Sequence, residues 1–230
     1  MLGKLIRRAR TLIESPIADR YDDEMVTRFR IARKALGGKP NADHLALLLE
    51  LKGTEVTDFG GAAGEMARAL AAHGIRVTVV ENPTMVRLGR RSPGVEFATD
   101  IPSTCDVFFS SGTIQYIKDP LPILDRAFVS AKQAVVLVRN AFSDKPIASV
   151  QESWLSDNGG GPTKVPGFKD VRISYPHWTV RESDVFAAAE LHGFRCTLKQ
   201  DEDKKDGAFP KAAYGRRLVF KRHDAPTTVM

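Results

Sequence analysis

The sequence contains few cysteines, and this scarcity limits the kinds of site that it can build. Two of its 230 residues are cysteines, Cys105 and Cys196. They lie far apart, and neither has a cysteine or histidine neighbour at the spacing of metal ligands. We therefore expect two buried thiols in a reducing compartment and no metal site.

A long apolar run is also missing. No stretch approaches the roughly 20 consecutive apolar residues of a membrane-spanning helix. Near the N-terminus, Lys4, Arg7, Arg8 and Arg10 interrupt any apolar core of a signal peptide. The lack of a span and of an export signal predicts a cytoplasmic protein.

Acidic residues are outnumbered by basic ones, which leaves a net charge of +6. Basic residues gather in two stretches, 4–33 and 204–222. Such a surplus favours anionic partners: nucleic acid, phosphorylated small molecules or a membrane surface. An ordinary solvated basic surface is the alternative interpretation.

Three helices are expected before the first strand. Residues 2–13 place apolar side chains at three- and four-residue spacing with basic residues between them, the pattern of a basic amphipathic helix. This helix either packs against the protein or a partner, or makes peripheral contact with a membrane. Further helices are expected over 23–36 and 42–51, so residues 1–52 form an N-terminal helical extension.

From residue 55 the sequence pattern alternates between strands and helices. We expect strands over 55–59, 76–81, 95–98, 106–109 and 134–138, and helices over 65–73, 85–90 and 121–130. Repeated strand-helix-strand units require a parallel sheet with helices on both faces.

The alternation stops after Arg139. Residues 140–180 are rich in glycine and proline and are expected to form a long loop, which in a compact domain is functional or disordered. A helix over 182–192 follows, and then strands over 194–199 and 216–221. The connection between these two strands suits an antiparallel hairpin.

The first strand ends in a glycine-rich turn. Its residues are Asp58, Phe59, Gly60, Gly61, Ala62, Ala63 and Gly64. Such a turn brings backbone close to a bound nucleoside at the carboxyl edge of a parallel sheet. The spacing departs from the Gly-x-Gly-x-x-Gly of dinucleotide-binding proteins. It approximates the methyltransferase form Asp-x-Gly-x-Gly-x-Gly, with Ala62 at the middle glycine.

An acidic residue follows the second strand at a spacing that suits the same ligand. Glu81 lies about twenty residues beyond the turn, where a carboxylate accepts both ribose hydroxyls of a nucleoside. Together the two features favour S-adenosylmethionine as the cofactor over a merely structural strand-to-helix corner.

Further cofactor contacts are expected after strands two, three and four. They are Asn82, Pro83, Asp100, Ile101, Ser110 and Ser111. Asn82 and Pro83 would flank the adenine. Asp100, beside Ile101, would bond the adenine amino group or cap a turn. The two serines would contribute backbone or hydroxyl contacts.

Four segments give the sequence a resemblance to a known family. They are Asp58-Phe59-Gly60-Gly61, Val80-Glu81-Asn82-Pro83, Ser110-Ser111-Gly112-Thr113-Ile114-Gln115-Tyr116 and Ser174-Tyr175-Pro176-His177-Trp178. On these segments the chain resembles the methyltransferases of the leptospiral LIC12133-like family over about residues 21–221. The resemblance implies a class I S-adenosylmethionine-dependent methyltransferase. It also implies a sugar or sugar-nucleotide acceptor in polysaccharide biosynthesis.

The chain departs from the pattern of that family at two places. Val138-Arg139-Asn140 stands where an acidic residue and an arginine are expected after the fifth strand, so no role for an acid carries over. His177 occupies a position where the relatives have cysteine.

The predicted fold is an α/β fold of the Rossmann-like class I methyltransferase type. It has a mostly parallel seven-stranded sheet with an antiparallel C-terminal strand, preceded by the extra N-terminal helices. Residues 53–222 form this domain, and residues 223–230 are expected to be a flexible tail.

Four side chains are candidates for the chemistry. His177 is the candidate general base, because histidine is the side chain that most often takes a proton in such steps. Tyr175 offers a stacking surface for a sugar. Tyr116 would approach the positive sulfur of the donor, and Arg139 would bind an acidic group of the acceptor. A structural role is the alternative for each.

Three other functions compete with a small-molecule methyltransferase. A nucleic-acid methyltransferase fits the basic ends, but no Asn/Asp-Pro-Pro-Tyr-type element follows the fourth strand. A nicotinamide-dependent dehydrogenase is disfavoured by the glycine spacing. A non-catalytic scaffold would keep the fold without holding the donor. The sequence leaves the oligomeric state open.

Overall fold

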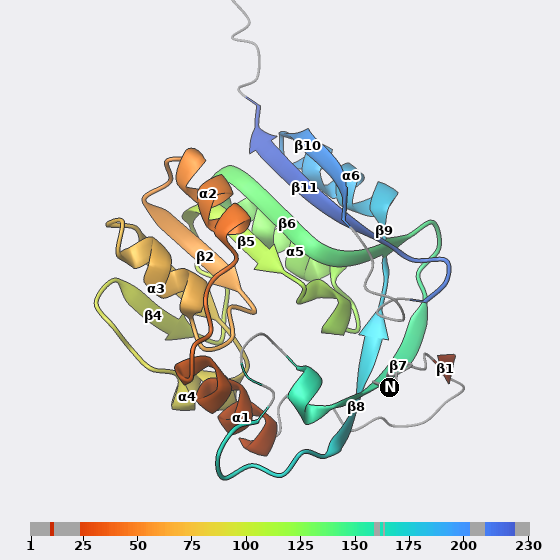
Figure 1. The fold of residues 1–230 in the computed structure, drawn as a ribbon. Helices are drawn as coiled ribbons and strands as arrows, with labels where there is room; N and C mark the ends of the chain where they lie inside the picture. Colours follow the sequence, from red (N-terminus) through yellow and green to blue (C-terminus); the bar gives the residue numbers. More distant parts are fainter. Residues whose placement is uncertain (1–9, 12–23, 159–161, 163, 203–209, 224–230) are drawn as a thin grey trace, which may run out of the picture.

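The computed structural model describes residues 10–11, 24–158, 162, 164–202 and 210–223. Within these ranges the chain forms a main sheet covered by helices and a smaller sheet to one side of it (Figure 1). No helix in this described part has the length and apolarity needed to span a bilayer.

The main sheet runs in the order β10-β11-β6-β5-β2-β3-β4, and the short strand β9 pairs with β6. Its strands are β2 (Glu55–Phe59), β3 (Arg76–Val80), β4 (Val95–Ala98), β5 (Cys105–Ser111), β6 (Ala131–Ser143), β9 (Val180–Arg181), β10 (Phe194–Glu202) and β11 (Tyr214–Arg222). β11 is antiparallel to both of its neighbours, whereas β4, β3, β2, β5 and β6 are parallel. The predicted mostly parallel sheet with an antiparallel C-terminal strand is confirmed.

Helices cover the main sheet on both faces because its strands are apolar on both sides. The helices are α2 (Ala42–Glu50), α3 (Glu65–Ala71), α4 (Pro83–Leu88), α5 (Leu121–Ser130) and α6 (Glu182–Leu191). Leu48 of α2 and Leu70 of α3 pack with Val79 and Val136 on one face. α5 and α6 pack on the other face, together with Phe108 of β5.

One crossover connection lacks a helix. Parallel strands are usually joined by a helical crossover of a dozen or more residues, but β4 reaches β5 through residues 99–104, none of which is helical. As a result, part of the sheet face that carries α5 and α6 stays open beside β2, β3 and β4.

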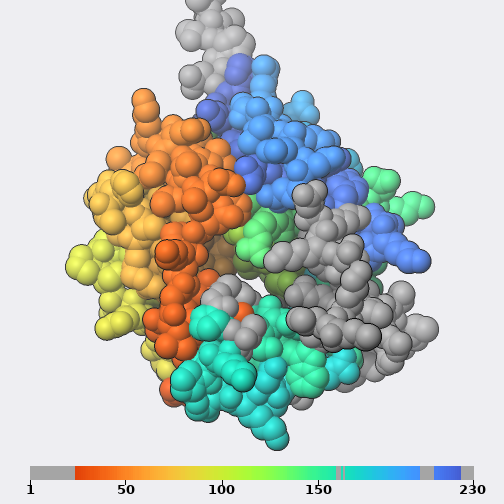
Figure 2. All heavy atoms as spheres, in the orientation of Figure 1, coloured from red at the N-terminus to blue at the C-terminus, as the bar shows by residue number. Residues whose placement is uncertain are grey.

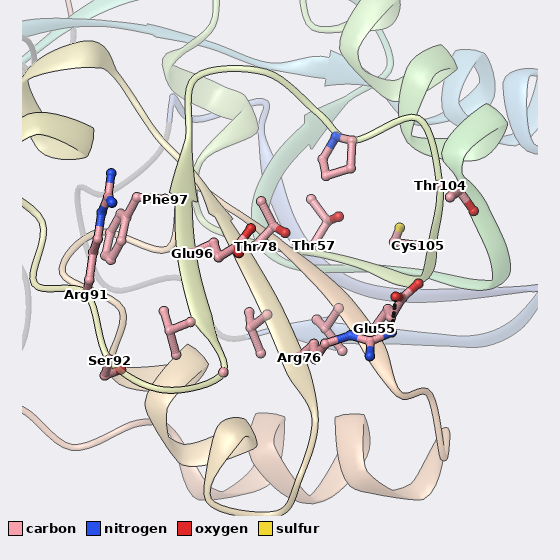
Figure 3. Close-up of a pocket in the computed structure, with 15 residues that line it drawn as sticks. Glu55, Thr57, Arg76, Thr78, Arg91, Ser92, Glu96, Phe97, Thr104 and Cys105 are labelled. Atoms are coloured by element: carbon pink, nitrogen blue, oxygen red, sulfur yellow. Dashed lines mark hydrogen bonds and ion pairs between the residues drawn. The ribbon is translucent and has the colours of Figure 1, made fainter.

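The open face forms a groove of about 780 Å³ (Figure 3). Thr57, Thr78 and Glu96 of the three strands line it, and Glu55 forms an ion pair with Arg76 at its rim. These side chains are polar because the strands alternate between the covered face and this open one.

The segment 140–180 is not the long loop that the sequence suggests. β6 continues to Ser143, and β7 (Ala148–Trp154) pairs antiparallel with β8 (Arg172–Trp178), with the 3-10 helix η3 (Leu155–Asp157) following β7. The sequence of β7 does not show the apolar alternation of a strand, because β7 buries Ser149, Gln151 and Ser153 instead of apolar residues. Pro176 lies in β8, where an edge strand tolerates proline.

The predicted N-terminal amphipathic helix is wrong at the two residues of it that the structure describes. β1 (Arg10–Thr11) is a short strand that pairs with β7 at Val150 and Ser149. Its backbone thus extends the exposed edge of β7. The rest of that predicted helix, and the membrane contact proposed for it, lie outside the described residues, as does the tail from residue 224 onward.

α1 (Glu24–Ala35) packs against the small sheet, and Glu24 also forms an ion pair with Arg87 of α4 at 2.7 Å. Val26 and Phe29 share a buried cluster with Leu155, Ile173 and Tyr175. We call α1, β7, η3 and β8 the cap, because α1, η3 and β8 contribute to this cluster and β7 pairs with β8.

A buried arginine ties the cap together. The Arg33 guanidinium of α1 donates hydrogen bonds to the carbonyls of Ser156, at 2.5 Å, and Asn158, at 3.0 Å. Lys34 pairs with Glu65 of α3 at 3.7 Å and so connects the cap to the main domain.

Candidate functional site

The glycine turn adopts a conformation that larger residues resist. Gly60 and Gly64 have φ angles of +75° and +79°, and Ala62 also lies in the left-handed region, at +51°. A Cβ on Gly60 would lie 2.0 Å from Thr113 Oγ1, and one on Gly61 would lie 2.3 Å from an oxygen of Asp58. The glycines therefore let the turn approach both the segment after β5 and its own carboxylate.

The turn is fastened to the end of β3. The Gly60 amide donates to the Val80 carbonyl at 2.8 Å, and the Ala62 amide donates to Glu81 Oε1 at 3.0 Å. Glu81 Oε2 accepts the Asn82 amide, also at 3.0 Å. The two motifs that the sequence separates by about twenty residues are thus in direct contact. Glu81 Oε2 also accepts a hydrogen bond from Asn82 Nδ2 at 3.2 Å, so Oε1 is the oxygen that keeps the capacity to accept another.

Asn82 and Pro83 begin α4 instead of forming a loop. The Asn82 side chain accepts the Met85 amide at 2.8 Å, and Pro83 occupies the first helical turn, where its missing amide proton costs nothing. This cap fixes the backbone directly after Glu81 and so holds the carboxylate beside the turn.

Asp58 is a buried acid on which two carboxylates, and no basic side chain of the described residues, act. Its side chain is 2% exposed, and Oδ2 has no hydrogen-bond partner in the described structure. Burial, and then the nearby Glu81 and Glu65 carboxylates, raise its pKa to about 7. A buried polar atom without a partner costs about 1–3 kcal/mol. A ligand that brought a cation or a hydrogen-bond donor to this point would remove that cost.

The expected contacts after β4 and β5 lie at the same edge. The Glu81 amide donates to the Ala98 carbonyl, which places the end of β4, and with it exposed Asp100 and buried Ile101, beside the Glu81 backbone. Ser110 is fully buried with an unpartnered Oγ, whereas the neighbouring Ser111 is half-buried.

Three of the four candidates for chemistry meet in space. Tyr116, in the 3-10 helix η2 (Ile114–Tyr116), makes edge-to-face contacts with Tyr175 at 5.5 Å and with His177 at 5.9 Å between ring centroids. Tyr175 and His177 lie two residues apart in β8 and are buried. The Tyr175 hydroxyl donates to Ser153 Oγ at 3.4 Å. η2 thus joins the carboxyl end of β5 to the cap.

Arg139 lies apart from this aromatic group. It occupies a bulge in β6 with a φ angle of +57°, and its amide donates to a Glu202 carboxylate oxygen. Its side chain is exposed. Burial, and then the Arg217 and Arg139 guanidiniums, lower the pKa of His44 to about 4. The Arg139 guanidinium is therefore within electrostatic reach of His44 in α2.

Sequence reasoning missed two buried amides beside Arg139. Gln115, 5% exposed, donates from Nε2 to the Arg139 carbonyl at 3.3 Å, and Asn140 is fully buried. Gln115 Oε1 and both polar atoms of Asn140 have no partner in the described structure. The sequence signal was their position directly after strand ends, where polar residues at this sheet edge are often functional.

The groove of Figure 3 is not the site formed by the glycine turn and Glu81. Glu55 and Arg76 are the first residues of β2 and β3, so the groove lies toward the amino ends of the strands, whereas the glycine turn follows their carboxyl ends. The space-filling view shows an opening between the orange and green atoms of the main domain and the teal atoms of the cap (Figure 2). Ligands of such folds bind beyond the carboxyl ends.

Comparison with solved structures identifies the fold. The magnesium protoporphyrin IX methyltransferase of Synechocystis PCC 6803 is 13% identical, with a TM-score of 0.51, over 92% of this chain and 87% of the other. An amino pentose methyltransferase from Micromonospora echinaspora is 14% identical, with a TM-score of 0.52, over 92% and 100%. The N-terminal domain of EvdMO1 is 14% identical, with a TM-score of 0.52, over 92% of this chain and 100% of the other.

These likenesses confirm a Rossmann-like fold of the methyltransferase type. No protein-family model matches the chain. No curated protein matches its sequence. The resemblance to the leptospiral LIC12133-like family is therefore supported only at the coarser level of the fold that it implies.

Proposed function

We propose that the protein is an S-adenosylmethionine-dependent methyltransferase. The observation that carries the proposal is the contact between the glycine turn and Glu81, next to an unpartnered, buried Asp58. The comparisons support it, since the Synechocystis and Micromonospora structures both contain the bound donor.

The residues at this edge fit that cofactor. A carboxylate suits the ribose hydroxyls, and Glu81 Oε1 has free capacity to accept a hydrogen bond from one of them. Asp58 suits the positively charged end of the donor, because a nearby cation favours the ionised carboxyl. Gly60 and Gly61 leave room where a Cβ would collide. When bound, S-adenosylmethionine supplies an electrophilic methyl group.

The proposed acceptor is a hydroxyl of a sugar, a sugar nucleotide or another small molecule, with a role in polysaccharide biosynthesis. The inner face of the cap supports a polar acceptor, because β7 buries Ser149, Gln151 and Ser153 where a structural sheet would bury apolar side chains. Two neighbouring structures add support: one is an amino pentose methyltransferase, and the other was solved with D-fucose.

The chain's own contribution is mainly to orient the acceptor and exclude water. His177 is the proposed base that accepts the hydroxyl proton. Tyr116 contacts the His177 ring edge-to-face, which favours one orientation of that ring, and Tyr175 in turn packs edge-to-face on Tyr116. The Tyr116 ring also offers a surface for a cation. Arg139 would attract an anionic part of the acceptor from the rim.

Calorimetric titration tests the cofactor. S-Adenosylmethionine should bind with a micromolar Kd, and NAD should not bind. Glu81→Ala should weaken donor binding about 100-fold, because a charge-assisted hydrogen bond to the ribose is lost. Glu96→Ala is the matched control: it removes the same side chain from the adjacent groove and should leave the Kd unchanged. A folded wild-type protein that binds no donor would overturn the proposal.

A further inference from the structure

Two neutral amides lie where the main domain meets the cap. Gln115 belongs to η2, and Asn140 follows the bulge of β6. The hydrogen bond from Gln115 Nε2 to the Arg139 carbonyl brings the Gln115 side chain next to the backbone that carries Asn140. Both side chains are more than nine-tenths buried.

Most of the hydrogen-bonding capacity of these amides is unused. Asn140 Oδ1, Asn140 Nδ2 and Gln115 Oε1 have no partner within the described residues. Buried polar groups in proteins are almost always paired with protein or with an ordered molecule. Three unpaired atoms from adjacent residues therefore point to a polar group that enters from outside.

The position of the amides fits the acceptor and not the donor. β5 and β6 pair in parallel up to Ser111 and Val138, so Gln115 follows the carboxyl end of β5, and Asn140 lies in β6 just beyond the part that pairs with β5. The donor motifs follow β2 and β3, on the far side of β5 in the sheet order. Tyr116, next to Gln115, touches His177, the proposed base.

The chemistry of the pair selects a neutral group. An amide offers both a donor and an acceptor and carries no charge, which matches a hydroxyl, itself a donor and an acceptor. A phosphate or carboxylate would meet the partial negative charge of Asn140 Oδ1 and Gln115 Oε1. The Arg139 side chain is exposed, and the guanidinium of Arg216, the β11 residue paired with Asn140, already forms ion pairs with Glu182 and Asp201.

We propose that Gln115 and Asn140 bind hydroxyl groups of an uncharged, polyhydroxylated ring, and so determine which part of the acceptor enters the site. This inference rests on the proposed methyltransferase function and names its substrate class. Any charged part of the acceptor then stays outside the amide pair, on the surface where the exposed Arg139 side chain lies.

Nuclear magnetic resonance on the full chain saturated with S-adenosylhomocysteine tests this assignment. The probes are glucose, glucuronate and glucose phosphate, which share the ring and differ in charge. Glucose should shift the side-chain amide signals of Gln115 and Asn140, and the two anions should bind at least about tenfold more weakly, as expected for an unfavourable contact in place of a hydrogen bond.

Variants of similar shape separate recognition from folding. Gln115→Met and Asn140→Leu should each weaken glucose binding about tenfold, with the affinity for S-adenosylhomocysteine unchanged. Gln133→Met, which removes an exposed amide from the start of β6, is the control and should change neither. An unchanged affinity for S-adenosylhomocysteine also shows that each variant is folded.

The outcomes are distinct. Suppose that S-adenosylhomocysteine binds but glucose does not shift the side-chain amide signals of Gln115 and Asn140, or that the anions bind more tightly than glucose. In either case the inference is overturned and the proposed function stands. If the donor product does not bind to the folded wild type, the proposed function fails and the inference falls with it.

Discussion

We call the glycine turn after β2 and Glu81 after β3 the donor edge. The donor edge and the cap are built in opposite ways. At the donor edge, the glycine turn and Glu81 come from one short stretch of chain and meet through backbone amides and a carboxylate. The cap gathers residues 24–35, 148–157 and 172–178, which pack through side chains around Phe29, Leu155 and Tyr175.

The difference extends to charge. The donor edge keeps an unpartnered acid, Asp58, beside two other carboxylates. The cap buries neutral polar groups that bond one another, as Asn158 Nδ2 does with Ser153 Oγ at 2.9 Å. The donor edge therefore holds electrostatic strain that a ligand would relieve, whereas the cap gains its stability from packing. This contrast predicts that the two regions respond to different changes.

Removing a cap side chain should give the largest effect on stability. Phe29 is 2% exposed and packs edge-to-face on Phe168 at 5.5 Å. Phe29→Ala should destabilise the protein by about 4 kcal/mol, since it leaves a cavity. Hydrogen exchange of the β8 amides should accelerate, while the donor Kd measured by calorimetry should stay the same.

The control for this variant is Leu36→Ala, at an apolar side chain just after α1 that is 52% exposed. It should change stability little. If Phe29→Ala weakens donor binding as strongly as it loosens the cap, the two regions form one cooperative unit and the comparison is wrong.

Neutralising Asp58 should increase the stability of the protein, whereas Phe29→Ala lowers it. Because its pKa rises from 3.8 to about 7 on folding, the folded protein holds a proton that the unfolded chain has lost between these values, and stability falls as pH rises through that window. Asp58→Asn should therefore stabilise the protein at pH 8 by on the order of 3 kcal/mol, with no gain near pH 3.

Thermal unfolding followed across this pH range measures the effect, and calorimetry should show that the same variant binds S-adenosylmethionine more weakly than the wild type. A stability gain that is equal at all pH values would contradict the electrostatic explanation, because only an ionised Asp58 carries the cost.

The smallest effect is expected at Ala62. Its φ angle of +51° is unfavourable for a residue with a Cβ. Ala62→Gly should raise the free energy of unfolding by up to about 1 kcal/mol, because the relief of strain exceeds the added flexibility of the unfolded chain. Chemical denaturation measures this gain. Ala63→Gly, one residue further, should destabilise instead, because Ala63 has no positive φ angle.

The periodic part of the fold was predictable. The strands at 55–59 and 95–98 and the helix at 121–130 begin and end as expected, because Val/Phe-rich runs and a proline before α5 mark them clearly. The segment 140–180 was not predictable, because β7 buries serines and a glutamine, which reverses the apolar alternation on which strand prediction depends.

The candidate site divides along the same line. The sequence indicated Asp58, Gly60 and Glu81 because their spacing is a property of one strand-turn-helix unit. For Gln115 and Asn140 the sequence signal is only their position after predicted strand ends, since a buried amide has no spacing rule of its own. Their burial without a full set of partners among the described residues is what distinguishes them.

By itself, the sequence determined the parallel sheet, its glycine turn and the acidic residue after the second strand, because these depend on periodicity and local backbone conformation. Only the tertiary structure decided that α1 joins the cap, that Tyr116 contacts Tyr175 and His177, and that the Arg139 side chain is exposed. Those arrangements depend on contacts between distant segments, whose free energy is set by burial and packing and leaves no local pattern in the chain.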